Sequence, residues 1–87
     1  MKRPSWWEWE LDCTNPHLLK RMVDRGFSEI DLREMLETAS DYEADHAQGR
    51  WLIHTIHSDR PWDVVVEPDE SLKLLVVVTA YPTESKR

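Results

Sequence analysis

Residues 15–28 constrain the fold more than any other part of the chain. They open with an Asn-Pro pair, which is typical of a helix N-cap followed by proline at the first helical position. Gly26 predicts the end of that helix, and Ser28 with Asp31 predicts the capped start of another. We therefore expect a helix over about residues 16–25, a tight turn, and a second helix that buries the stripe Leu32, Met35, Leu36 and Ala39.

After the second helix the period of the apolar residues changes from 3.6 to 2, which indicates strands. Alternation over 51–56, a β-branched run over 62–67 and an apolar run over 72–81 predict three antiparallel strands. Turn-forming residues over 58–61 and 68–71 separate them. The last run is apolar on both faces, so we expect it inside the sheet.

Two weaker strands complete the expected sheet. Trp7, Trp9 and Leu11 alternate with acidic residues, which predicts a half-buried first strand, and residues 42–46 predict a short edge strand. The expected fold is α+β, with the order β-α-α-β-β-β and a helical hairpin packed on a mostly antiparallel sheet. We expect residues 1–87 to form a single domain with an ordered core over about 9–82.

Charge and cysteine content limit the functions that such a chain can have. Its 11 basic and 17 acidic residues give a net charge of -6, so nucleic acid would bind only at a local basic patch. The single cysteine, Cys13, excludes an internal disulfide and suits a reducing compartment. The longest apolar run, residues 74–78, is too short to cross a bilayer. We expect a cytoplasmic protein with no membrane partner.

A cationic stripe on the first helix is the main candidate for a binding site. His17, Arg21 and Arg25 stand at i, i+4 and i+8, so their side chains share one helix face. The neighbouring stripe is apolar and is expected to face the core, which places the cations at the margin between helix and sheet. We expect Arg21, Arg25 and Thr79 to bind an anion there, at the end of the last strand near Tyr81.

The pattern H-x-x-x-R-M-x-x-R-G-F over 17–27, followed by a helix and by V-V-V-E (64–67) and V-V-V-T-A-Y (76–81), resembles a small bacterial domain family of unknown function. In element order that family is similar to the RelE/ParE and BrnT toxins, which are small metal-independent ribonucleases or gyrase poisons. The resemblance covers roughly residues 9–82. The present chain departs from those toxins in being acidic.

The resemblance implies a metal-independent ribonuclease or translation inhibitor, with RNA and a cognate antitoxin as partners. Such cleavage needs a base, an acid and cations that stabilise the phosphorane. Arg21 and Arg25 would clamp the phosphate, His17 or His54 would exchange the proton, and Tyr81 would donate a hydroxyl hydrogen bond. These five residues form the predicted catalytic set.

No metal or cofactor is expected. His54 and His57 are three residues apart, which on a regular strand sends them to opposite faces. With only Gly26 and Gly49, the chain has no glycine-rich phosphate loop.

The alternative is a non-catalytic protein-interaction module that uses the N-terminal aromatics and the acidic second helix. A small core cannot easily hide Trp6, Trp7 and Trp9 besides two further tryptophans, so we expect these three at a homodimer or partner contact. Seven acidic residues against one basic residue lie between positions 29 and 45. In this interpretation Arg21 and Arg25 pair with acids of the second helix such as Glu34 or Glu37.

Overall fold

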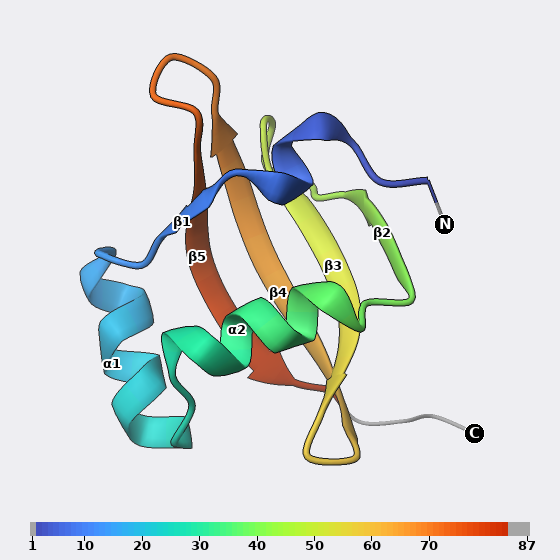
Figure 1. Ribbon diagram of the computed structural model, residues 1–87. Helices are drawn as coiled ribbons and strands as arrows, with labels where there is room; N and C mark the ends of the chain where they lie inside the picture. Colours follow the sequence, from blue (N-terminus) through green and yellow to red (C-terminus); the bar gives the residue numbers. More distant parts are fainter. Residues whose placement is uncertain (1, 84–87) are drawn as a thin grey trace.

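The computed structural model describes residues 2–83 and confirms the predicted α+β fold. Within these residues one sheet has the strand order β1-β5-β4-β3-β2 (Figure 1). Its strands are β1 (Glu10–Asp12), β2 (Asp41–Ala44), β3 (Trp51–His57), β4 (Arg60–Asp69) and β5 (Leu74–Pro82). β1 runs parallel to β5, and every other neighbouring pair is antiparallel. The remaining elements are a 3-10 turn, η1 (Ser5–Glu8), and the helices α1 (Pro16–Arg25) and α2 (Glu29–Glu37).

The helical hairpin forms as its cap residues predict. The Asn15 side chain accepts a hydrogen bond from the backbone N–H of His17, which begins α1. Gly26 ends α1 in the left-handed region with a φ of 69°, which glycine adopts without strain. At the start of α2 the side chains and backbones of Ser28 and Asp31 bond reciprocally in a capping box.

The last three predicted strands are confirmed, but the turns between them place their ends at other residues than predicted. Ser58 and Asp59 have φ values of 54° and 63°, which is typical of a two-residue hairpin turn. Such a turn leaves only these two residues unpaired, so β4 begins at Arg60 rather than at residue 62. The next turn occupies residues 70–73 instead of 68–71. β2 confirms the short edge strand.

The predicted first strand is wrong in its N-terminal half. Trp7 lies in η1, and the strand itself is limited to Glu10–Asp12. The reason is that Trp6 and Trp7 are adjacent and both buried, whereas a strand would send neighbouring side chains to opposite faces. The 3-10 turn allows both indoles to enter the core, where the Trp7 Nε1–H donates a 3.1 Å hydrogen bond to the Leu36 carbonyl.

The burial of Trp6 and Trp7 also removes the reason for expecting them at a dimer contact. Their rings stack at 5.6 Å and pack beside Tyr42 and Trp51 within one chain. Trp9 is only partly buried and packs against the core. A homodimer through this segment stays a prediction, and its contact surface would have to exclude the two buried indoles.

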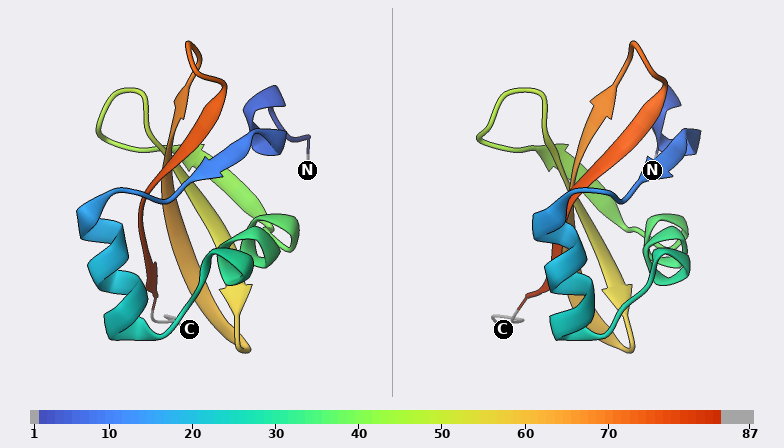
Figure 2. Two further views of the ribbon diagram at one scale, coloured as in Figure 1. Left: turned by 60° about the vertical axis from the view of Figure 1, so that its left-hand side comes forward. Right: turned by 90° about the vertical axis from the view of Figure 1, so that its left-hand side faces the viewer.

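Helices cover one face of the sheet and one of its margins. α2 and the N-terminal segment lie over one face, and α1 runs beside β5 (Figure 2). Ile53, Val64 and Val77 are fully buried under this cover. Because side chains alternate along a strand, their neighbours in sequence point to the other side. We call that side the open face; its strand residues include Asp41, Glu43, Leu52, His54, Ile56, Asp63, Val65, Glu67, Val76, Thr79 and Tyr81.

A buried hydroxyl joins the covered face to α2 and supports a first prediction. Thr55 is 4% exposed, and its Oγ1 donates to the Met35 carbonyl near the end of α2. Substitution of Thr55→Val keeps the shape but removes the closer hydroxyl donor to that carbonyl, because the Thr38 hydroxyl reaches it only at 3.5 Å. We expect the free energy of unfolding to fall by about 1–3 kcal/mol in urea denaturation. Thr55→Ser, which retains the hydroxyl, should lose less; equal losses in the two variants would contradict this role.

Candidate functional site

The cationic stripe of α1 reaches the last strand through Arg25. Its Nη1 donates a 2.9 Å hydrogen bond to the carbonyl of Ala80, between Thr79 and Tyr81 in the sequence. The guanidinium therefore lies at the position that the helical spacing predicts for it. One of its five N–H donors is thus used by the backbone, and anion binding by the others stays a prediction.

The other members of the stripe lie away from that position. Arg21 contacts Asp24 of its own helix at 3.9 Å. His17 is exposed at the N-terminal end of α1, two helical turns and about 12 Å of rise from Arg25. The predicted pairing of Arg21 and Arg25 with acids of the second helix is wrong, since no ion pair joins α1 to α2 in the described part of the chain.

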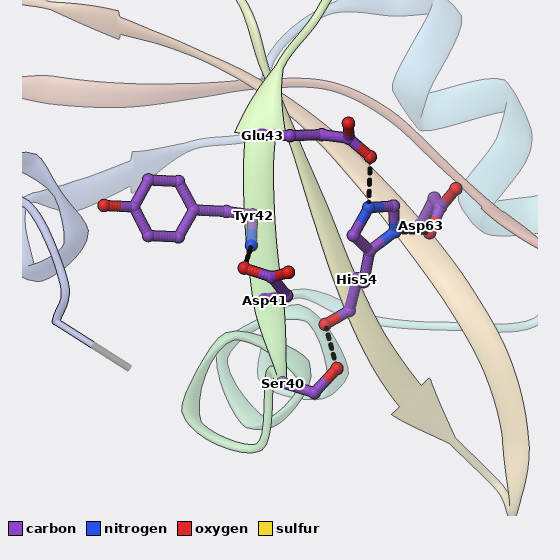
Figure 3. A network of polar contacts seen from close by, with 6 residues as sticks. All are labelled: Ser40, Asp41, Tyr42, Glu43, His54 and Asp63. Atoms are coloured by element: carbon purple, nitrogen blue, oxygen red, sulfur yellow. Dashed lines mark hydrogen bonds and ion pairs between the residues drawn. The ribbon is translucent and has the colours of Figure 1, made fainter.

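A second cluster of polar side chains lies on the open face and joins three strands (Figure 3). His54 of β3 lies between two carboxylates. Its Nδ1 is 2.8 Å from Oδ1 of Asp63 on β4, and its Nε2 is 2.7 Å from Oε2 of Glu43 on β2. Asp63 is 15% exposed, whereas Glu43 is 62% exposed. The ring thus has a hydrogen-bond partner on each side, and the partner on the β4 side, Asp63, is the more buried of the two.

This arrangement favours the charged form of His54. A carboxylate can only accept hydrogen bonds, so both contacts are made only when both ring nitrogens carry a proton. Burial by itself lowers the pKa of His54, but the hydrogen bonds and charges of Asp63 and Glu43 outweigh it and raise the pKa above 6.5. With a hydrogen bond from each ring nitrogen, the His54 side chain is a proton donor and is unsuited to the role of general base.

Tyr81 lies beside this cluster, directly opposite Asp63 in the pairing of β4 with β5. Burial and then the negative charges of Asp63 and Asp45 raise the pKa of its hydroxyl. Tyr81 consequently stays protonated at neutral pH and can donate a hydrogen bond. The charges that act on this hydroxyl are those of carboxylates, however, and they repel a phosphate.

The structure thus divides the predicted catalytic residues. His54 and Tyr81 share the open face, Arg25 lies at the adjacent margin, and His17 and Arg21 lie outside. Sequence reasoning missed Asp63 and Glu43. The signal for Asp63 was present, because a two-residue turn at 58–59 pairs His57 with Arg60 and therefore His54 with Asp63.

The open face as a whole is acidic. Among residues 2–83 its cations are Arg50 and His54, and each contacts carboxylates: Arg50 Nε lies 3.2 Å from Oε1 of Glu67, and His54 lies between Glu43 and Asp63. Aliphatic side chains lie among the charges, and Ile56 is 58% exposed. The carboxylates on this face and at its rim are those of Asp41, Glu43, Asp45, Asp63 and Glu67.

Residues 15–82 match the family described as a domain of unknown function, DUF4258. The chain belongs to this family. The matched segment begins at the N-cap of α1 and ends with β5, so the DUF4258 domain comprises the helical hairpin and strands β2–β5. η1 and β1 precede it. Neither the curated proteins nor the solved structures yielded a match to the chain.

Two other kinds of site find no support in this DUF4258 domain. Among residues 2–83 no group of three or more histidine, cysteine or acidic side chains is arranged to hold a metal ion. Burial, followed by the charges of Glu29 and Asp12, raises the pKa of the Cys13 thiol to about 11. The thiol is therefore protonated and unreactive at neutral pH.

No helix in the described part of the chain is long and apolar enough to cross a membrane.

Proposed function

We propose that this DUF4258 domain is a non-catalytic protein-binding module whose open face binds a cationic segment of a partner protein. One observation carries the proposal: the open face gathers carboxylates from β2, from β4 and from the segment after β2, and among the described residues its two cations, Arg50 and His54, are already bound to some of them. A face of this charge repels the phosphates of RNA and attracts lysine and arginine side chains.

The aliphatic residues of the open face extend this complementarity. Leu52 of β3 is half-buried on this face, and Ile56, further along the same strand, is largely exposed. The methylene stems of lysine and arginine can pack on such side chains while their charged heads reach the surrounding carboxylates. A cationic segment with alternating apolar residues therefore fits both properties of this face.

The proposed surface differs from the one that the sequence predicts for an interaction module. Trp6 and Trp7 are buried and unavailable in the folded chain. The acidic side chains of α2 remain a competing surface, because Glu34 and Glu37 are exposed. Any test must therefore separate α2 from the open face.

A nuclear magnetic resonance titration with a peptide of alternating lysine and leucine makes this separation. We expect the peptide to shift amide signals of β3, β4 and β5, and we expect the affinity to fall as salt is added. A glutamate–leucine peptide of the same length is the control and should cause no shifts. Shifts confined to α2 would assign binding to the acidic helix, and no shifts at low salt would contradict the proposal.

A toxin-like ribonuclease or translation inhibitor is the second candidate. The observation that favours it is the placement of Tyr81, His54 and Arg25 at one end of the sheet, where two proton donors and a guanidinium lie near each other. In this case RNA would be the substrate and an antitoxin would be the protein partner.

Induced expression in a bacterium, with growth as the readout, tests the second candidate. The comparison is with a folded variant that carries Arg21→Ala and Arg25→Ala. Growth arrest and RNA cleavage that only the wild-type chain produces would favour the ribonuclease over the binding module. Unaffected growth with the folded wild-type chain, and no RNA cleavage by the purified protein, would remove the ribonuclease.

A further inference from the structure

We propose that His54 is a pH-operated clamp, which holds the edge strand β2 to the sheet while its ring is doubly protonated and releases it when one proton leaves. The geometry is specific to this task. One ring on β3 contacts a carboxylate on each neighbouring strand, at 2.8 Å on the β4 side and 2.7 Å on the β2 side. The clamp therefore spans β2, β3 and β4 through a single titratable group (Figure 3).

The difference in burial decides which contact breaks. Loss of the proton from Nδ1 would leave the Asp63 carboxylate, which is 15% exposed, without its donor. Loss of the proton from Nε2 affects Glu43, which is 62% exposed and can exchange the ring for water. The Nε2 proton therefore leaves to water, and the Nδ1–H bond to Asp63 remains. The Nε2 lone pair then faces the Glu43 carboxylate, and this repulsion turns the Glu43 side chain away.

β2 is the strand that depends most on such a contact. It has four residues and pairs with β3 alone, at the edge of the sheet. On the covered side it is held by Tyr42, whose ring packs on Trp6 and Trp7. On the open side the Glu43–His54 contact is its side-chain link to the sheet. Release of Glu43 thus loosens one side of β2 and leaves the other side anchored.

The surroundings of His54 set the direction of the pH response. Glu43 and Asp41 face it from β2, Asp63 faces it from β4, and Tyr81 lies beyond Asp63 on β5. The three carboxylates are negative and Tyr81 is uncharged while its raised pKa keeps it protonated, so the surroundings favour the protonated ring. The clamp is closed below about pH 6.5 and opens as the pH rises through the raised pKa of the folded state.

The clamp also regulates the surface described above, and this consequence rests on the proposed function. Deprotonation removes one positive charge from the open face and frees the Glu43 carboxylate. A cationic segment should therefore bind more tightly above the transition than below it. The clamp itself requires no ligand, so it can be tested independently of binding.

Hydrogen exchange and nuclear magnetic resonance on the full chain from about pH 6 to about pH 9 provide the test. We expect the His54 ring to titrate above 6.5. Protection factors of β2 amides should fall about two- to fivefold across that titration, as the loss of a half-exposed ion pair implies. Amides shared by β4 and β5 should keep their protection.

Two variants complete the experiment without any ligand. His54→Gln cannot titrate, so its β2 amides should show no step with pH. Asp63→Asn keeps the shape but removes a negative charge, so it should lower the midpoint of the His54 titration. A pKa of the wild-type His54 ring at or below 6.5 would overturn the clamp, as would protection factors of the β2 amides that do not change across the titration. Neither result would affect the binding proposal.

Discussion

Replacing Trp7 with alanine is expected to lower the free energy of unfolding by about 3–5 kcal/mol. The indole is 2% exposed, stacks on Trp6, and packs edge-on against Tyr42 at 5.4 Å between ring centroids. Its Nε1–H also satisfies the Leu36 carbonyl near the end of α2. The substitution therefore combines a large cavity with a lost hydrogen bond. Urea denaturation followed by circular dichroism measures the loss without relying on tryptophan fluorescence.

Trp9→Ala is the matched control because Trp9 lies in the same segment but is only partly buried. It should cost less than half as much, since far less apolar surface leaves contact with the core. A loss at Trp7 as small as the loss at Trp9 would show that the N-terminal segment is not part of the cooperative core. The comparison matters because this segment precedes the matched DUF4258 residues, 15–82, yet supplies two of the buried aromatic rings.

The helical hairpin could be predicted closely because its signals are local, although α2 ends at Glu37, before Ala39 of the expected stripe. A cap residue, a proline at the first position and a left-handed glycine act within one turn of the chain. The strands could be predicted from their period, but their ends depend on the turn type. The N-terminal turn could not be predicted, since alternation of Trp7 with acidic residues is compatible with a strand until the burial of Trp6 is known.

The sequence predicted the place of a site residue only where a single helix or strand determines that place. Helical spacing alone places Arg25 at the margin with β5, and there the structure agrees with the sequence. The contacts of His54 depend on the pairing of three strands, which periodicity does not determine. For the same reason the acidic residues after position 40 were assigned to the surroundings of the second helix. Strand pairing instead carries Glu43 to the open face and to His54.

Reversing two charges on the open face should abolish most of the binding to a lysine–leucine peptide. The variant carries Glu43→Lys and Glu67→Lys, at positions where both side chains are substantially exposed. Each lysine would meet the cationic peptide as a like charge, which opposes association strongly. We expect the dissociation constant to rise by about tenfold or more, equivalent to about 1.4 kcal/mol, and its dependence on salt to weaken. Fluorescence anisotropy of a labelled peptide at two salt concentrations measures both effects.

The decisive control changes the net charge by the same amount at the other acidic surface. Glu34→Lys and Glu37→Lys lie on the exposed side of α2, in its last turn, where cations are compatible with the helix dipole. Because the net charge of the two double variants is equal, a difference between them reports only where the peptide binds. We expect the α2 variant to retain most of the affinity. A larger loss in the α2 variant would assign the function to the acidic helix, and equal losses would mean that the peptide responds to net charge alone.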